Sequence, residues 1–294
     1  MHSTRRLCVD GLSDLGVRRR NNEDAWWAGQ LNGEHRFMEP GSDPLRLASE
    51  AGAPPILLLV SDGVGGANAG EVASQMAVTL ISGELTRAPA ALARPESAPQ
   101  AIHLALQVAD EAIKRKATEP EFEGMGATLS LLCFVGTETA YWGQAGDSRV
   151  YVCRRGELRQ ISRDHSPVGR LRQEGRITEE EARRHPQRNQ IDQSLGDPIK
   201  PFQPDVGAVQ LRPGDVFLVC SDGLSDGLFD REIKQLLAGV RSAGDVRPAV
   251  QQLVARAKEA SGRDNITAVV ALVENTDGET AGAKRGPSRK LAHL

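Results

Sequence analysis

Two segments of the sequence share a pattern in which an apolar stretch runs directly into Ser-Asp-Gly. The stretch at 56–60 leads to Asp62 and Gly63, and the stretch at 216–220 leads to Asp222. Each pattern predicts a buried strand that ends in a carboxylate, followed by a glycine that lets the backbone approach a neighbour closely. An isolated Asp-Gly after a strand is more often a turn, so neither copy alone indicates a functional site.

Further acidic residues stand at similar junctions. Asp147 lies in Gly-Asp-Ser-Arg between two strand-like stretches, and Asp264 begins Asp-Asn-Ile-Thr. Glu23 and Asp24 follow Asn22, where such a group alone is usually a solvated surface or a cap. Carboxylates gathered at the ends of buried strands repel one another unless cations bridge them, and oxygen ligands suit Mg²⁺ or Mn²⁺. Two such ions can lower the pKa of a shared water, which predicts hydrolysis of a phosphate ester without a nucleophilic side chain.

Other metal and nucleotide sites have little support in the sequence. The six histidines are scattered, and the four cysteines lack CxxC spacing, so zinc is not expected. The glycine-rich 63–66 lacks the GxxxxGK[ST] spacing of a phosphate-binding P-loop. The cysteines are expected to be buried, reduced thiols of a cytoplasmic protein rather than disulfides.

Composition narrows the function classes further. The chain has 294 residues, 39% hydrophobic and 26% charged, enough for one large domain or two small ones. Its formal net charge of -3 predicts no basic surface for nucleic acid. Apolar runs such as 56–60 are far shorter than the ~20 residues of a membrane-spanning helix, and Arg5 and Arg6 precede no apolar stretch typical of a secretory signal. We therefore expect neither a nucleic-acid partner nor a membrane.

The elements that would position these carboxylates alternate along the chain. Helix-like periodicity covers 70–85, 102–116 and 245–260. Arg155-Gly156-Glu157 predicts a tight hairpin, and short connections of this kind favour antiparallel pairing. The expected fold is a layered α+β domain, in which two layers of strand are plausible. Strands are predicted at 56–60, 127–135, 140–144, 149–154, 216–220 and 266–273.

Three segments predict looser structure. Residues 31–55, rich in glycine, proline and acidic residues, are expected to form a long surface insertion. Residues 165–196 are charged, with a short helical stretch at 178–184, and are expected to form a mobile flap. From residue 276 onward the composition is typical of a disordered tail.

In order and spacing, the motifs resemble the type 2C family of metal-dependent protein phosphatases, in its bacterial form. Any one motif is weak evidence, but six in the family's order, over about residues 10 to 273, are strongly specific. The matching segments are Gly16 to Asp24, Asp62 to Gly66 with Gly70 to Ser74, Gly124 to Thr128, Gly146 to Arg149, Ser221 to Leu224, and Asp264 to Thr267.

The resemblance implies an antiparallel β-sandwich flanked by α-helices, in α-β-β-α layers, with a catalytic domain at 1–275 and the tail at 276–294. It implies a serine/threonine protein phosphatase that hydrolyses phosphoserine and phosphothreonine on proteins with metal-activated water. The centre would hold two Mn²⁺ or Mg²⁺ ions at one end of the sandwich, with a weaker third ion beside them.

The same resemblance assigns the ligands of the two ions. Asp62 is expected to bridge both ions. Glu23 and the Gly63 carbonyl would complete one site, largely through water, and Asp222 and Asp264 would hold the other.

The remaining roles are also carried over from the family. Asp24 is expected to support the ligand network, and Asp147, assisted by Asn189, to help bind the third ion. Arg19 matches the arginine that grips the substrate phosphate, for which its planar fork is suited. Without the spacing to Glu23, Arg19 would be read as an exposed charge among arginines.

Two positions depart from family patterns. Eukaryotic relatives carry a histidine, often proposed as the general acid, where this chain has Val64, so the proton for the leaving group would come from a metal-bound water. Ala67 stands where many bacterial members have a histidine, which is expected to alter only the loop.

Two alternatives from other classes remain open at this stage. A catalytically dead relative could serve as a binding module, but such relatives commonly lose metal-site carboxylates, and every expected one is present. A two-metal nuclease shares the chemistry but needs a basic groove. Family analogy further suggests a monomer that acts on phosphorylated proteins, namely a serine/threonine kinase and its targets.

Overall fold

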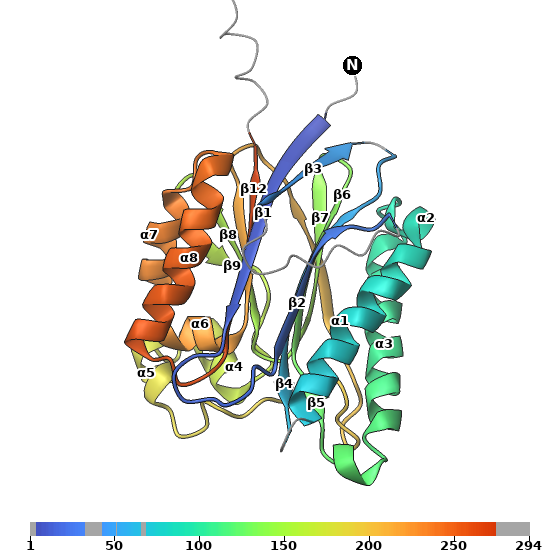
Figure 1. The fold of residues 1–294 in the computed structure, drawn as a ribbon, viewed down its shortest axis with the longest axis vertical. Coiled ribbons are helices and arrows are strands. Elements are labelled where there is room, and N and C mark those ends of the chain that lie inside the picture. The colour runs from blue at the N-terminus through green and yellow to red at the C-terminus, as the bar shows by residue number, and fades with distance from the viewer. Residues whose placement is uncertain (1–3, 33–42, 51, 66–68, 275–294) are drawn as a thin grey trace, which may run out of the picture.

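The computed structural model describes residues 4–32, 43–50, 52–65 and 69–274. Two antiparallel β-sheets face each other, and helices cover their outer faces (Figure 1). This arrangement confirms the predicted α+β sandwich. The first sheet has the order β3 (Leu45–Glu50), β1 (Thr4–Asp14), β12 (Ile266–Val273), β11 (Val216–Cys220), β8 (Arg149–Arg154) and β9 (Glu157–Gln160). The second has the order β10 (Asp205–Gln210), β7 (Thr139–Ala145), β6 (Leu129–Val135), β4 (Ile56–Val64) and β2 (Asp24–Gln30), with β5 (Gly126–Ala127) paired to β4.

The apolar character of β4 follows from burial on both of its faces. Leu58 and Val60 pack into the core between the sheets, whereas Leu57 and Leu59 pack into the core beneath the helices. A strand buried on both faces reads as a continuous apolar run rather than an alternating one. Between the sheets, the rings of Phe134 and Phe217 meet edge to face, with centroids 5.5 Å apart.

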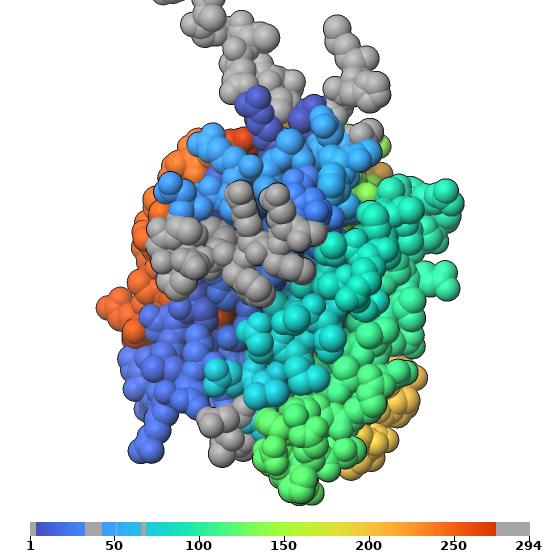
Figure 2. All heavy atoms as spheres, turned by 45° about the vertical axis from the view of Figure 1, so that its right-hand side comes forward, coloured from blue at the N-terminus to red at the C-terminus, as the bar shows by residue number. Residues whose placement is uncertain are grey.

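Each sheet carries its own layer of helices. α1 (Ala69–Arg87) and α3 (Ala98–Lys116) pack on the second sheet, and Figure 2 shows them side by side in cyan to green on the surface. α7 (Asp230–Ala238) and α8 (Ala243–Ala260) pack on the first sheet. No helix in the described ranges is both long enough and apolar enough to cross a membrane.

The remaining helices are short. They are α2 (Pro89–Leu92), η1 (Pro120–Phe122), α4 (Pro167–Gln173), α5 (Glu179–Arg184) and α6 (Asp222–Gly227).

Every strand and long helix predicted from the sequence is present. The hairpin between β8 and β9 is also confirmed, since Arg155 and Gly156 have φ of 54° and 79°, the left-handed conformations of a two-residue hairpin turn. All four cysteines are buried and unpaired, as expected.

The expected insertion at 31–55 is in part a strand. β3 pairs antiparallel with β1 at the edge of the first sheet, with Leu47 opposite Leu7, so this part of the segment is ordered structure. The polar composition of 31–55 concealed it, because an edge strand buries little of its surface. Residues 33–42 of the segment, Ala67 and the predicted tail lie outside the described residues.

Candidate active site

The predicted carboxylates converge at one end of the sandwich because strand pairing aligns their positions. Asp24, at the start of β2, is opposite Asp62 near the end of β4. On the other sheet, the Ser221 amide after β11 donates to the Thr267 carbonyl in β12 at 3.1 Å, so Asp222 and Asp264 lie beyond the same end of paired strands.

The glycine after each strand-end aspartate allows close backbone contacts, as the sequence predicted. A Cβ on Gly63 would lie 2.0 Å from the carbonyl oxygen of Gly70 at the start of α1. A Cβ on Gly223 would lie 2.0 Å from the carbonyl oxygen of Asn265. Any side chain there would force the strand and its neighbour apart, so glycine is required for Asp62 and Asp222 to lie where they do.

Hydroxyl groups fix the turn that carries Asp147. The Thr128 hydroxyl lies 2.6 Å from the Ser148 hydroxyl and accepts from the Asp62 amide at 3.1 Å. The Thr128 amide donates to the Asp62 carbonyl at 2.8 Å. Through Thr128, the Gly-Asp-Ser-Arg turn is therefore held next to the end of β4.

A cavity of about 590 Å³ opens where these elements meet. Eight of the nine residues assigned from the sequence line it, so they do lie around one space. They are Arg19, Glu23, Asp62, Gly63, Asp147, Asn189, Asp222 and Asp264.

Asp24, the ninth, is not among the lining residues. Its Oδ2 accepts hydrogen bonds from the Ser221 hydroxyl at 2.7 Å and the Thr267 hydroxyl at 2.6 Å. These bonds join β2 of one sheet to the ends of β11 and β12 of the other. This position agrees with the expectation that Asp24 supports the ligand network rather than lining the cavity.

Burial and mutual repulsion raise the pKa of the central carboxyl groups. For Asp62 the pKa lies well above its usual value, first because of burial and then because of the charges of Asp24 and Asp222. The pKa of Asp222 is likewise well raised, by burial and then by Asp147. Burial raises the pKa of Asp147 to about 7. Such a cluster favours bound protons or bound cations.

Arg19 lies against the acidic residues it was expected to accompany. Its Nη2 is 2.7 Å from Asp264 Oδ2, and its Nη1 is 3.5 Å from Glu23 Oε2. Its side chain is 45% exposed. Arg19 therefore balances two carboxylates of the cavity while keeping access to solvent.

The donor set fits hard divalent ions. The Oδ1 atoms of Asp24 and Asp222 are buried and accept no hydrogen bond, so they have unused capacity to bind a positive charge. Within the described ranges, no three acidic, histidine or cysteine side chains lie close enough together to hold one ion. The cavity offers only carboxylate and carbonyl oxygens from the assigned ligands, which suits Mg²⁺ or Mn²⁺.

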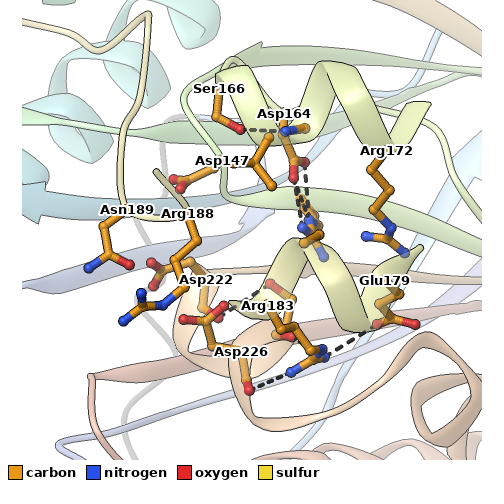
Figure 3. Close-up of a pocket in the computed structure, with 15 residues that line it drawn as sticks. Asp147, Asp164, Ser166, Arg172, Glu179, Arg183, Arg188, Asn189, Asp222 and Asp226 are labelled. Atoms are coloured by element: carbon orange, nitrogen blue, oxygen red, sulfur yellow. Dashed lines mark hydrogen bonds and ion pairs between the residues drawn. The ribbon is translucent and has the colours of Figure 1, made fainter. Parts of the chain in front are cut away.

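Sequence reasoning missed several charged residues of the site. Asp226, Arg188 and Arg183 of α5 line the cavity, and all three also line a smaller pocket beside it, together with Asp147 and Asp222 (Figure 3). The signal for Asp226 was available, since it stands four residues after Asp222 and so on the same face of a short helix. The arginines come from the charged 165–196 segment, whose docking the sequence pattern does not reveal.

Comparison with known proteins identifies the family. The family model of Protein phosphatase 2C matches residues 38–271. The chain belongs to the protein phosphatase 2C family. This confirms the resemblance found in the motifs.

Bacterial relatives of this phosphatase 2C chain include PstP and PhpP. It is 36% identical over 95% of its length to the serine/threonine protein phosphatase PstP of Mycobacterium tuberculosis, and spans about half of that relative, 48%. It is 32% identical to the protein phosphatase PhpP of Streptococcus pneumoniae, with 91% of this chain and 98% of the relative covered.

Solved structures of relatives share the fold. The serine/threonine phosphatase of S. agalactiae is 30% identical, with a TM-score of 0.76 over 91% of this chain and all of the other. The catalytic domain of PstP in complex with two manganese ions is 32% identical, with a TM-score of 0.73 over 93% and 100%.

Proposed function

We propose that this chain is a metal-dependent serine/threonine protein phosphatase, which hydrolyses phosphoserine and phosphothreonine on proteins. The observation that carries the proposal is the convergence of acidic residues from distant parts of the sequence around one cavity. They are Glu23, Asp62, Asp147, Asp222 and Asp264. Membership of the protein phosphatase 2C family and the names of the bacterial relatives support it.

The cofactor in this proposal is a pair of Mn²⁺ or Mg²⁺ ions, as in the PstP catalytic domain with two manganese ions. Asp62 would bridge the pair, Glu23 and the Gly63 carbonyl would serve one ion, and Asp222 and Asp264 the other. The bound ions would supply Lewis acidity that lowers the pKa of a water.

The other residues of the site would orient the metal ligands, bind the substrate phosphate or hold the third ion. Asp24 holds the Ser221 and Thr267 hydroxyls beside the ligands. When substrate binds, the Arg19 guanidinium would exchange its ion pair with Asp264 for one with the substrate phosphate. The guanidinium is half-exposed and lines the cavity, and its planar fork matches two phosphate oxygens. Asp147 and Asn189 would serve a weaker third ion.

The test is turnover of a phosphothreonine peptide and of para-nitrophenyl phosphate. Asp62→Asn and Asp222→Asn are each expected to abolish turnover, and chelator is expected to do so in the wild type reversibly on return of Mn²⁺. Unchanged activity in either variant would refute the metal assignment. Cleavage of DNA or RNA without phosphopeptide turnover would favour a nuclease, and absence of Mn²⁺ binding by calorimetry would favour a binding module.

The cellular setting is proposed on narrower grounds. Four buried, unpaired cysteines suit the reducing cytoplasm. By analogy with the family, we propose a monomer with a role in signal transduction, acting on a serine/threonine kinase and its targets. We further propose that 1–275 is the catalytic domain and that 165–196 is a flap that shapes substrate choice, since its Asn189 and Arg188 line the cavity.

A further inference from the structure

One arginine of the 165–196 segment grips the end of the helix that begins at Asp222. Nη2 of Arg183, in α5, donates to the carbonyls of Ser225 and Leu228, each at 2.5 Å. Its Nη1 donates to the Asp226 carbonyl at 2.6 Å. All three acceptors belong to the last turn of α6 or the residue directly after it.

These carbonyls are groups that a helix cannot satisfy by itself. The last four carbonyls of a helix have no donor within the helix, so they need water or a side chain. A guanidinium presents several donors in a planar fork, whereas an ammonium is a compact point charge. Arg183 thus bonds several carbonyls of α6 at once, and its positive charge suits the C-terminal end of the helix.

Further contacts hold the guanidinium in this orientation. It lies over the ring of Phe229, 4.1 Å from the centroid, and 3.3 Å from the Glu179 carboxylate one turn earlier in α5. Its side chain is only 18% exposed. Glu179 also accepts from the Asp230 amide at 3.0 Å, so α5 binds both the end of α6 and the start of α7.

The neighbouring helix of the segment adds a second attachment. Arg172 in α4 donates to the Asp230 carboxylate at 2.5 Å, and that carboxylate also accepts from the Tyr151 hydroxyl of β8 at 3.1 Å. Asp230, at the start of α7, is therefore held by Arg172 of α4 and by Tyr151 of the first sheet.

Because α6 has only six residues, its two ends cannot move independently. Asp222 at its first position and Asp226 near its end both line the cavity. Given the proposed phosphatase function, on which this step rests, we propose that Arg183 is a positioning residue that couples docking of the 165–196 segment to placement of the Asp222 carboxylate. Release of this contact would leave the α6 carbonyls unpaired and let the helix shift, which would weaken metal binding.

Arg184 provides a matched control in the same helix. Its side chain is 79% exposed and pairs with Glu180, itself 62% exposed, at 2.8 Å. It has the same charge and the same local sequence but faces solvent. A change of arginine to lysine at 184 should therefore leave α6 unaffected.

The first measurement needs neither metal nor substrate. In chelator, hydrogen exchange of the α6 amides and of Leu228, which donates to the Leu224 carbonyl at 2.9 Å, is compared among wild type, Arg183→Lys and Arg184→Lys. Faster exchange confined to α6, the 165–196 segment and the start of α7 is expected in Arg183→Lys alone. Equal exchange in all three proteins would overturn the proposed attachment.

The second measurement separates positioning from general stability. Arg183→Lys is expected to bind Mn²⁺ by calorimetry at least ~10-fold more weakly, as for other groups that orient metal ligands. Its kcat at saturating Mn²⁺ should recover toward the wild type. A lower melting temperature in chelator with unchanged Mn²⁺ affinity would show a purely structural role and overturn the proposal. If the wild type bound no Mn²⁺, the proposed phosphatase function would fail as well, while hydrogen exchange would still report on the attachment itself.

Discussion

The Asp24 carboxylate joins the two sheets beside the site without lining the cavity. Its Oδ1 is buried, burial raises the pKa of the carboxyl group to about 6, and the two hydroxyl bonds to its Oδ2 act in the opposite direction. The Thr267 hydroxyl also lies 2.7 Å from the Ser13 hydroxyl in β1, and the Ser221 hydroxyl accepts from the Thr267 amide at 3.0 Å. The ends of four strands, β1, β2, β11 and β12, therefore share one set of hydrogen bonds, and Asp222 directly follows Ser221 of this set.

This network predicts that Asp24→Asn lowers Mn²⁺ affinity without abolishing it. An amide keeps the shape and one acceptor but loses the charge, and loss of groups that orient ligands costs about 10–100-fold in metal affinity or activity. Calorimetric titration with Mn²⁺ measures the effect. Asp62→Asn, which removes a proposed ligand itself, should bind far more weakly than Asp24→Asn. Equal affinities of the two variants would contradict the separate roles.

The site residues were predictable from the sequence to different extents. Asp62 and Asp222 were found because each stands in a local pattern, an apolar strand followed by Asp-Gly. Arg183 was not, because its contacts depend on where α6 and the 165–196 segment meet, and Asp226 was overlooked although it stands four residues after Asp222. The pairing of Arg19 with Asp264 also joins residues far apart in the sequence.

At the level of elements, glycines decide how closely the strands and helices of the site approach. Gly223 is packed against the Asn265 carbonyl, and its Cβ position is also 3.4 Å from the Asp264 Cβ. Both aspartates of one proposed ion site therefore depend on a single close contact between α6 and the start of β12.

Gly223→Ala is accordingly expected to lower the free energy of unfolding by about 1–3 kcal/mol, the usual cost of forcing extra volume into a packed site. It should also weaken Mn²⁺ binding, since α6 must move away from Asp264. Denaturant unfolding in chelator and calorimetry measure the two effects.

Gly83 in α1 serves as the control, because nothing lies within 4 Å of its Cβ position. Gly83→Ala should stabilise the helix by about 0.5–1 kcal/mol and leave Mn²⁺ affinity unchanged. A Gly223→Ala variant as stable as Gly83→Ala would show that the close contact is not required.

The strand β1 was not predicted from the sequence, for a physical reason. β1 carries Asp10 and Gly11 in its middle, which are uncommon within strands. In the structure Asp10 pairs with Arg247 of α8 at 2.9 Å, and a Cβ on Gly11 would lie 2.6 Å from the Trp26 ring. The central strands could be predicted from their continuous apolar sequences. β1 could not, because Asp10 and Gly11 are suited to tertiary contacts and interrupt its strand-like pattern.

At the level of the whole molecule, the acidic end of the sandwich opposes folding when no cation is bound. The pKa of Asp222 is raised in the folded protein, so the folded state holds its proton more tightly than the unfolded state does. Its ionisation therefore removes stability as pH rises from the unfolded pKa through the folded pKa. Below the unfolded pKa this penalty is absent.

Removal of the charge should therefore stabilise the metal-free protein at neutral pH. In chelator at pH 7.5, Asp222→Asn is expected to melt above the wild type, by about 2–4 °C for each kcal/mol of relieved repulsion. The difference should shrink as pH is lowered toward 4, because the wild-type carboxyl becomes protonated. Melting curves at several pH values measure it.

Added Mn²⁺ should reverse the order at pH 7.5, because a ligand that binds only the folded state raises its stability with concentration. The wild type gains this stabilisation, and Asp222→Asn, which lacks a proposed ligand, gains much less. Asp245→Asn is the control, since Asp245 caps the start of α8 by accepting from the Ser242 amide at 2.8 Å and does not line the cavity. It should melt below the wild type in chelator and keep the Mn²⁺ gain. A wild type that melts above Asp222→Asn in chelator at pH 7.5 would mean that the carboxylates are already balanced without metal, by Arg19 and its neighbours.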